Sequence, residues 1–282
     1  MADEDDTLKP STKVTMSKDS VPGSARVPKD MFPPEDVTLA IVLPVLNERG
    51  NLEKVLPRLD RLAMTVPIKE VIFVDDGSTD GSLELLRAES ERQWRFKIVL
   101  ISRVEKLGQV NACIVGAKVA NAQLVVFMDA DLQHPPETIA TLYSQIMNGG
   151  QVVSASRHMT ASAIHRTSYR GLISRGATMI SYALLSNTRS LTDPMSGFFL
   201  TWKRYVSDLS PLTNRCKLLL YVLATHADLQ CIEVPYGFEE RRSGSSKTVG
   251  PSPNFMIRFL IEILTYYKLS RKSVISNRSE SS

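Results

Sequence analysis

The chain has 282 residues, of which 43% are hydrophobic, enough to fill the core of one large α/β domain or of two small ones. The net charge of +4 is mild, and we expect no nucleic-acid partner. Three widely spaced cysteines without a CxxC pair indicate neither a disulfide framework nor a zinc site, and they fit a reducing, cytosolic setting.

Residues 1–36 are predicted to form a disordered tail. They hold eight acidic side chains, five basic ones and five prolines, and they show no apolar periodicity. No signal peptide is expected there, because the charged start lacks the apolar stretch of such peptides. The folded part is therefore expected to begin near residue 37.

Five short apolar runs rich in Val and Ile predict the strands of a sheet. They cover residues 38–46, 69–76, 97–102, 123–129 and 151–156. Segments with helical spacing lie between them, at 49–63, 79–93, 107–121 and 136–148. Strands that are apolar throughout and alternate with helices predict an α/β fold with a mostly parallel sheet flanked by helices.

Polar clusters follow three of these strands, with the sequences LPVLNE, VDDGSTD and MDADLQ. Ligands of parallel α/β sheets bind outside the carboxyl ends of the strands. We therefore expect the three clusters to line one crevice.

The cluster VDDGSTD places Asp75 and Asp76 at a strand end, with Gly77 to turn the chain and Ser78 or Asp80 to cap the following helix. Asp76 could hydrogen-bond a base or a ribose from this position. The alternative is a plain turn from strand to helix.

The sequence DAD holds Asp129 and Asp131, two residues apart. Side chains at i and i+2 of an extended chain point to the same side, so both carboxylates are expected to face one spot. Two such carboxylates share a proton or bind a cation. Mg²⁺ and Mn²⁺ suit the pair, because a hard divalent ion accepts one or two carboxylates and takes further oxygens from water and substrate phosphates. The alternative for a DxD sequence alone is a solvated loop.

The chain becomes basic after residue 156. Residues 157–192 contain no Asp or Glu, and residues 241–282 carry eight basic side chains against two acidic ones. Amphipathic helices are predicted within 168–185 and 255–269. The apolar face of the first is formed by Tyr169, Leu172, Ile173, Ile180, Ala183 and Leu184. Flanking basic residues favour helices lying in a membrane interface; the alternative is that both faces pack on the core.

Several sequence blocks resemble those of family 2 glycosyltransferases, specifically the dolichyl-phosphate mannosyltransferase group. They are LPVLNERGNLEKVLPRL, EVIFVDDGSTDGS, RVEKLGQVNACIVGAKVANAQLVVFMDADLQHPPE, LTDPMSGFF and FEERRSGSSK. The early blocks imply the GT-A (Rossmann-like) fold and a nucleotide-sugar donor. DADLQHPPE with DPMSGFF is specific for the polyprenyl-phosphate group, and DPMSGFF favours mannose over glucose. The resemblance implies a GT-A domain over 37–250, and the residue pattern predicts an amphipathic basic segment over 251–282.

The resemblance also implies a set of residues that bind the nucleotide sugar. They are Pro44, Leu46, Glu48, Asp76, Asp129, Ala130, Asp131, Arg157, Lys217, Arg241 and Lys247. Within this set, Asp76 would contact the guanosine part. The family usually has an aromatic residue where this chain has Leu46, so stacking on the base is not expected there.

The resemblance assigns Asp129, Asp131 and Gln133 to a divalent metal ion, Mg²⁺ or Mn²⁺, held against the diphosphate. Asp131, Arg157 and Arg241 are the expected catalytic residues. A lipid phosphate is already an anion at neutral pH, so its attack on the sugar needs no general base, only orientation and charge screening.

The implied reaction is an inverting transfer of mannose from GDP-mannose to a polyprenyl (dolichyl) phosphate at the cytoplasmic face of a membrane, where many relatives recruit small membrane subunits. UDP-glucose as donor is the first alternative. The second is a non-catalytic membrane-associated subunit that keeps the fold to bind nucleotide or lipid. It is favoured by departures around Lys217, where Arg215, Cys216 and Tyr221 replace the family's usual residues.

Overall fold

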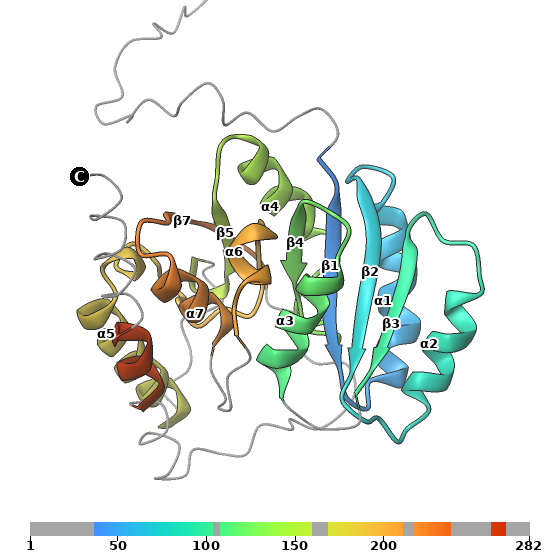
Figure 1. Ribbon diagram of the computed structural model, residues 1–282, viewed down its shortest axis with the longest axis horizontal. Helices are drawn as coiled ribbons and strands as arrows, with labels where there is room; N and C mark the ends of the chain where they lie inside the picture. Colours follow the sequence, from blue (N-terminus) through green and yellow to red (C-terminus); the bar gives the residue numbers. More distant parts are fainter. Residues whose placement is uncertain (1–36, 104–107, 160–168, 211–216, 238–260, 269–282) are drawn as a thin grey trace, which may run out of the picture. The chain divides into compact units, whose positions relative to one another are not determined.

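The computed structural model describes residues 37–103, 108–159, 169–210, 217–237 and 261–268, whose arrangement is drawn as a coloured ribbon in Figure 1. The predicted tail over 1–36 lies outside the described residues. So do Arg241, Lys247 and most of the expected segment over 251–282.

Seven strands of the described residues form one sheet, in the order β3-β2-β1-β4-β6-β5-β7 (Figure 1). Their bounds are β1 Leu39–Val45, β2 Ile68–Asp75, β3 Lys97–Ser102, β4 Leu124–Phe127, β5 Val152–Ser156, β6 Phe199–Trp202 and β7 Cys231–Pro235. β6 runs antiparallel to β4 and β5, and the other neighbouring strands are parallel. The predicted mostly parallel α/β sheet is confirmed, and β6 and β7 are strands that the apolar runs do not predict.

Helices connect the strands. Their bounds are α1 Arg49–Leu62, α2 Ser82–Ser90, α3 Gln109–Val119, α4 Thr138–Met147, α5 Tyr169–Leu184, α6 Arg204–Ser207 and α7 Leu218–Thr225, with short 3₁₀ helices η2 Arg157–Met159 and η4 Ser186–Thr188. Residues 261–268 are also helical. α2 begins at Ser82 rather than at residue 79, because Gly81 before it has a left-handed φ of 86° that does not fit a helix, and it ends at Ser90 rather than at residue 93.

Alternate residues of β1 fill two hydrophobic cores. Ile41 and Leu43 belong to the core beneath α1, α2 and α4, whereas Ala40 and Val42 belong to the core beneath α3, α5 and α7. Successive side chains of a strand point to opposite faces of the sheet, so a continuous apolar run supplies both cores. Each fully buried Leu or Ile contributes about 1.5–3 kcal/mol to folding.

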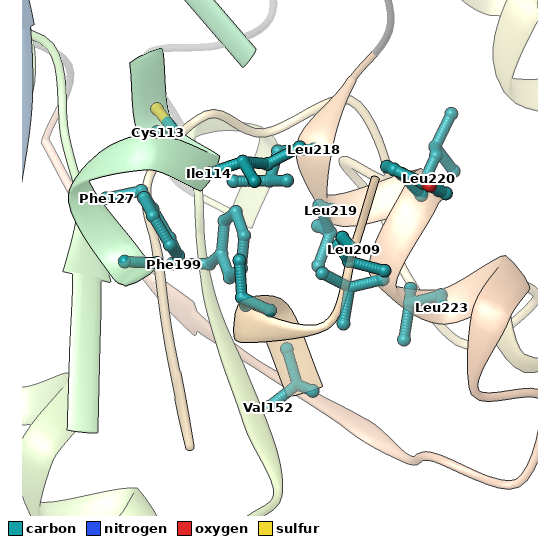
Figure 2. Close-up of a cluster of buried hydrophobic side chains, with 14 of the residues drawn as sticks. Cys113, Ile114, Phe127, Val152, Phe199, Leu209, Leu218, Leu219, Leu220 and Leu223 are labelled. Atoms are coloured by element: carbon teal, nitrogen blue, oxygen red, sulfur yellow. The ribbon is translucent and has the colours of Figure 1, made fainter. Parts of the chain in front are cut away.

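The core beneath α3, α5 and α7 is called the second core. Figure 2 shows the part of it where α3 and α7 cover the sheet. The rings of Phe127 in β4 and Phe199 in β6 lie 5.0 Å apart, centroid to centroid. A Cβ atom at Gly116 of α3 would lie 2.4 Å from Val42 Cγ1, so the close approach of α3 to β1 requires glycine there. This packing brings the start of α3 to the strand ends that carry the polar clusters.

The predicted apolar face of α5 is partly confirmed as a core-packing face. Ala177 is buried in the second core, and Ile180 and Leu184 pack against it. Ala183, expected on the same face, is exposed, and so is 70% of Met179. The core-packing alternative therefore holds for this half of the helix, which still leaves apolar surface exposed.

The described part of the second predicted amphipathic helix, 261–268, shows the same division. Ile263 and Tyr266 are buried in the second core. Ile261 and Leu264 are 52% and 50% exposed. None of the helices in the described ranges combines the length and apolar character needed to span a bilayer.

Candidate active site

The three polar clusters follow neighbouring strands. β1 pairs with both β2 and β4. The Asp76 N–H donates to the Val45 carbonyl at 2.9 Å, and the Met128 N–H donates to the Val42 carbonyl at 3.3 Å. Both bonds continue the pairing past the ends of β2 and β4, so the clusters lie at adjacent strand ends as expected.

Hydrogen bonds join the first two clusters. The N–H of Asn47, a residue with φ of 53°, donates to Ser78 Oγ at 2.8 Å, and Asn47 Oδ1 accepts from the Thr79 N–H at 2.7 Å. The Glu48 N–H donates to Ser82 Oγ at 2.9 Å. Asparagine tolerates the left-handed region better than most residues, so it suits position 47, where the two loops meet. The two loops therefore form one hydrogen-bonded unit.

Asp75 and Asp80 stabilise turns. The Asp75 carboxylate accepts the N–H groups of Gly77 at 3.0 Å and Ser78 at 3.2 Å. Asp80 Oδ1 accepts the N–H of Ser82, the first residue of α2, at 3.0 Å. Asp80 therefore has the predicted capping role, although Gly81 is the residue directly before the helix.

Asp76 is paired with Arg103, a residue outside the set expected from the sequence. Arg103 Nε donates to Asp76 Oδ1 at 2.6 Å, and the two side chains are only 9% and 11% exposed. Arg103 Nη2 also donates to the Gly108 carbonyl at 3.0 Å. Arg103 directly follows β3, so the strand-end rule that selected the other clusters would have found it.

The other residues expected to border the nucleotide lie just beyond β1 or at its end. Pro44, Leu46 and Glu48 are each partly exposed. Glu48 Oε2 accepts from Asn51 Nδ2 at 2.6 Å, a contact within the first turn of α1 that fixes the carboxylate.

The acidic loop after β4 differs from the expectation of an extended chain. β4 ends at Phe127, two residues before Asp129, and Leu132 has a left-handed φ of 63°. The i, i+2 argument for a shared side therefore does not apply, and the loop is shaped by its own hydrogen bonds. Asp131 is 4% exposed, and its Oδ1 accepts the Gln133 N–H at 3.1 Å.

His134 closes this loop. Its Nδ1 accepts the N–H of Asp129 at 3.0 Å, and its ring stacks on Phe198 with centroids 4.9 Å apart. Burial lowers the pKa of His134 below its ordinary value, Asp129 and Asp131 act to raise it, and Arg157 and Lys217 act to lower it further. The two predicted acids and two of the predicted cations therefore act on one buried ring.

Arg157 is held by the loop that contains DPMSG. Arg157 Nε lies 3.2 Å from Asp193 Oδ2, and Asp193 is 4% exposed. The Glu233 carboxylate accepts the N–H groups of Thr192 and Asp193 at 2.6 and 2.8 Å. Neither Asp193, which lies in this motif, nor Glu233 is among the site residues expected from the sequence.

Tyr236 adjoins the same charges. Its ring meets those of His134 and Phe198 edge-on, at 5.9 and 5.7 Å between centroids. Burial raises the pKa of Tyr236, Arg157 acts to lower it, and Asp193, Asp129 and Asp131 act to raise it. The phenol therefore stays protonated at neutral pH.

Lys217 is exposed and directly precedes α7. The departure at Tyr221 has a structural explanation, because its ring stacks on Tyr266 at 5.8 Å and its hydroxyl donates to the Ser210 carbonyl at 3.2 Å. Tyr221 is thus a core residue of the second hydrophobic core.

The residues present fit a divalent ion shared with a ligand. The described residues contain no group of three or more His, Cys, Asp or Glu that could hold a metal. Asp129 and Asp131 offer two carboxylates, and Gln133 adds an amide oxygen. Mg²⁺ and Mn²⁺ are commonly bound by one or two carboxylates together with substrate phosphates and water, which matches this donor set.

Comparison with known proteins agrees with the sequence resemblance. The model of the family described as glycosyl transferase family 2 matches residues 40–210. A dolichol-phosphate mannosyltransferase from Pyrococcus furiosus is 33% identical over 81% of this chain, which spans 64% of that relative's length. A dolichol-phosphate mannosyltransferase from Saccharomyces cerevisiae is 30% identical over 82% of this chain and 87% of its own.

A solved structure has the same fold. Glucosyl-3-phosphoglycerate synthase from Mycobacterium tuberculosis, crystallised with Mn²⁺, UDP-glucose and phosphoglyceric acid, matches with a TM-score of 0.62 and 20% sequence identity. The match covers 83% of this chain and 81% of that one. The GT-A fold is confirmed by this likeness.

Proposed function

The chain belongs to glycosyl transferase family 2, and from that premise we propose that it transfers mannose from GDP-mannose to a polyprenyl (dolichyl) phosphate. The names of both relatives support transfer of mannose to dolichol phosphate. The observation that carries it is the acidic loop after β4, in which Asp131 is 4% exposed and the Asp129 N–H donates to His134 Nδ1 at 3.0 Å, together with Arg157, held 3.2 Å from Asp193 directly after β5. Acids and cations gathered at strand ends suit a reaction in which a diphosphate leaves and a phosphate attacks.

The donor's nucleotide would lie over the ends of β1 and β2. Asp76, held by Arg103, would contact the guanosine part, and Pro44, Leu46 and Glu48 would border it. The short Asn51–Glu48 hydrogen bond supports an oriented carboxylate at this border.

The diphosphate end of the donor would meet the acidic loop. Asp129, Asp131 and Gln133 would hold Mg²⁺ or Mn²⁺, with Ala130 beside the donor. When bound, such an ion neutralises charge that develops on the departing diphosphate. The fixed position of Asp131 supports this role, because its side chain is 4% exposed and its Oδ1 accepts the Gln133 N–H at 3.1 Å.

The acceptor phosphate would be bound by cations. Arg157 is the best oriented of them, because Asp193 fixes its guanidinium and Glu233 fixes the Asp193 backbone. Lys217 would add a point charge. Arg241 and Lys247, whose loop lies outside the described residues, are proposed for the same task. A single in-line displacement by the phosphate would invert the configuration at the sugar.

The domain assignment and the location also remain proposals. Residues 37–250 would form the catalytic domain, with 1–36 as a tail and 251–282 as a basic amphipathic segment. The protein would act at the cytoplasmic face of a membrane, with small membrane subunits as further partners. Exposed Met179, Ile261 and Leu264 on two helices support contact with lipid.

A transfer assay tests the proposal. The purified chain is given radiolabelled GDP-mannose or UDP-glucose, a polyprenyl phosphate in detergent, and Mg²⁺ or Mn²⁺. Label from GDP-mannose should enter the lipid fraction, and GDP should inhibit more strongly than UDP. Transfer from UDP-glucose alone would make the protein a glucosyltransferase. Metal-dependent stabilisation by GDP with no transfer from either donor would make it a non-catalytic binding subunit.

A further inference from the structure

Two residues without an assigned role contact Asp129. Gln109 is the first residue of α3, and its Nε2 donates to Asp129 Oδ1. His134 lies in the same loop as Asp129, and its Nδ1 accepts the Asp129 N–H at 3.0 Å. The side chain and the backbone of Asp129 are therefore each held by a different residue.

The contact with His134 is built into the core. The ring is 7% exposed and lies against Phe198, with Tyr236 edge-on. Nδ1 accepts a hydrogen bond only when it carries no proton, so the geometry selects the neutral ring with its proton on Nε2. The ring cannot move without disturbing this packing, and it therefore fixes the backbone at Asp129.

The two carboxylate oxygens of Asp129 have different surroundings. Oδ1 is engaged by the Gln109 amide, while Oδ2 lies 3.9 Å from His134 Nδ1, which is beyond hydrogen-bond distance. A carboxylate held in this way presents one oxygen to a cation. α3 itself is fixed by its close approach to β1 at Gly116.

We propose that Gln109 and His134 are positioning residues that hold Asp129 for a divalent cation, Gln109 through the side chain and His134 through the backbone. The inference rests on the proposed function, in which Asp129 binds that cation. Residues that hydrogen-bond to a metal ligand typically change metal affinity about 10–100-fold when they are mutated.

Four variants distinguish the loss of either contact from a general loss of structure. Gln109→Leu removes the amide at an exposed position, and Gln93→Leu is the matched control, since Gln93 is an exposed glutamine far along the chain from the loop. His134→Phe keeps a stacking ring without an acceptor. His134→Asn loses the ring but supplies an oxygen that can replace Nδ1.

The first measurement needs no metal. Amide hydrogen exchange of residues 128–134 should be about 2–10-fold faster at Asp129 in His134→Phe, the effect of losing one hydrogen bond, and close to wild type in His134→Asn. Gln109→Leu should also speed exchange in this loop, whereas Gln93→Leu should not. Exchange in Gln109→Leu and His134→Phe that matches the Gln93→Leu control would overturn the proposal.

The second measurement is Mn²⁺ affinity, followed by electron paramagnetic resonance with GDP present. Gln109→Leu should weaken Mn²⁺ binding about tenfold relative to Gln93→Leu. Unchanged affinity would show that Asp129 needs no positioning for the cation. If the wild type binds Mn²⁺ but transfers no mannose, the proposed function fails while the positioning role stands. If the wild type binds no Mn²⁺, the metal role of Asp129 fails, and with it the proposal.

Discussion

Arg103 and Asp76 form an ion pair between the ends of β3 and β2, with Arg103 Nε donating to Asp76 Oδ1 at 2.6 Å and both side chains about nine-tenths buried. The pair joins residues 27 positions apart in the sequence. Its second contact, from Nη2 to the Gly108 carbonyl, reaches the start of α3, where Gln109 contacts Asp129. Arg103 thus connects the proposed base-binding acid to the helix that holds the acidic loop.

Removing Arg103 should destabilise the protein strongly. Breaking a buried ion pair by deleting one partner costs about 3–5 kcal/mol, because the remaining charge is left unpaired. Arg103→Met should therefore lower the free energy of unfolding by about that amount, measured by urea denaturation. The double variant Arg103→Met/Asp76→Asn should recover part of the loss, since it leaves no buried charge.

The matched control for this substitution is Arg92→Met. Arg92 is 67% exposed and pairs with Glu89 three residues earlier. The Glu89 side chain is 14% exposed, but an ion pair with one partner mostly in water contributes less than about 1 kcal/mol, so this variant should remain close to wild type. Equal losses of unfolding free energy in Arg103→Met and Arg92→Met would mean that the Arg103–Asp76 pair stabilises the protein no more than the Arg92–Glu89 pair does.

Asp131 should be required for transfer but not for folding. Asp131→Ala removes one of the two carboxylates proposed for the metal, and losing a preorganised charge contact in an active site costs about 100–1,000-fold in rate. The fold should persist, and the thermal midpoint without metal should fall by only a few degrees, because the substitution removes the hydrogen bond from the Gln133 N–H to Asp131 Oδ1. Asp228→Ala, at an exposed position, is the control. Transfer at the wild-type rate in Asp131→Ala would remove the acidic loop from the reaction.

The sequence predicts the strands that consist of long apolar runs and misses the others for a physical reason. β1 to β5 are each apolar over most of their length. β6 has four residues and pairs antiparallel with β4 and β5, and β7 has five residues, including Glu233, at the sheet edge. β4 and β5 also have only four and five residues, so length does not separate the two groups. β6 and β7 form by pairing with segments distant in the sequence, which local patterns do not reveal.

The residues of the candidate site also fall into those that local sequence predicts and those that it does not. The strand-end rule found the neighbourhoods of Asp76 and Asp129, because parallel strands end at one edge. Their partners follow from contacts across the fold: Gln109 meets Asp129 across 20 residues, and Glu233 meets Thr192 across 41. Neither contact leaves a periodic signal, whereas His134 lies within the DADLQHPPE block and is not among the site residues expected from the sequence.

Stability should depend on pH through Glu137 and Arg58. Arg58 Nε and Nη2 donate to the Glu137 carboxylate at 2.9 and 2.6 Å, and these bonds hold the pKa of Glu137 below its ordinary 4.5. A pKa lowered on folding adds stability that is present above pH 4.5 and is lost as the pH falls through the folded-state value. Glu137 is 59% exposed, so the gain is less than about 1 kcal/mol.

Glu137→Gln tests this dependence. The variant should be slightly less stable than the wild type near neutral pH, and the difference should shrink in acid, as measured by urea denaturation at a series of pH values. Glu91→Gln, at an exposed position, provides the comparison. A difference that persists unchanged well below pH 4.5 would point to packing rather than charge.

Membrane binding should depend on the exposed apolar residues of α5 and 261–268. Met179 is 70% exposed, and Leu264 is 50% exposed. If these side chains enter a lipid interface, Met179→Ser and Leu264→Ser should each weaken flotation with anionic liposomes about tenfold, since a buried apolar side chain contributes about 1.5–3 kcal/mol. Met64→Ser is the matched control, because Met64 is 63% exposed but lies just after α1. Equal flotation of all three variants would contradict a lipid-facing role for these helices, and the exposed side chains would then need another explanation.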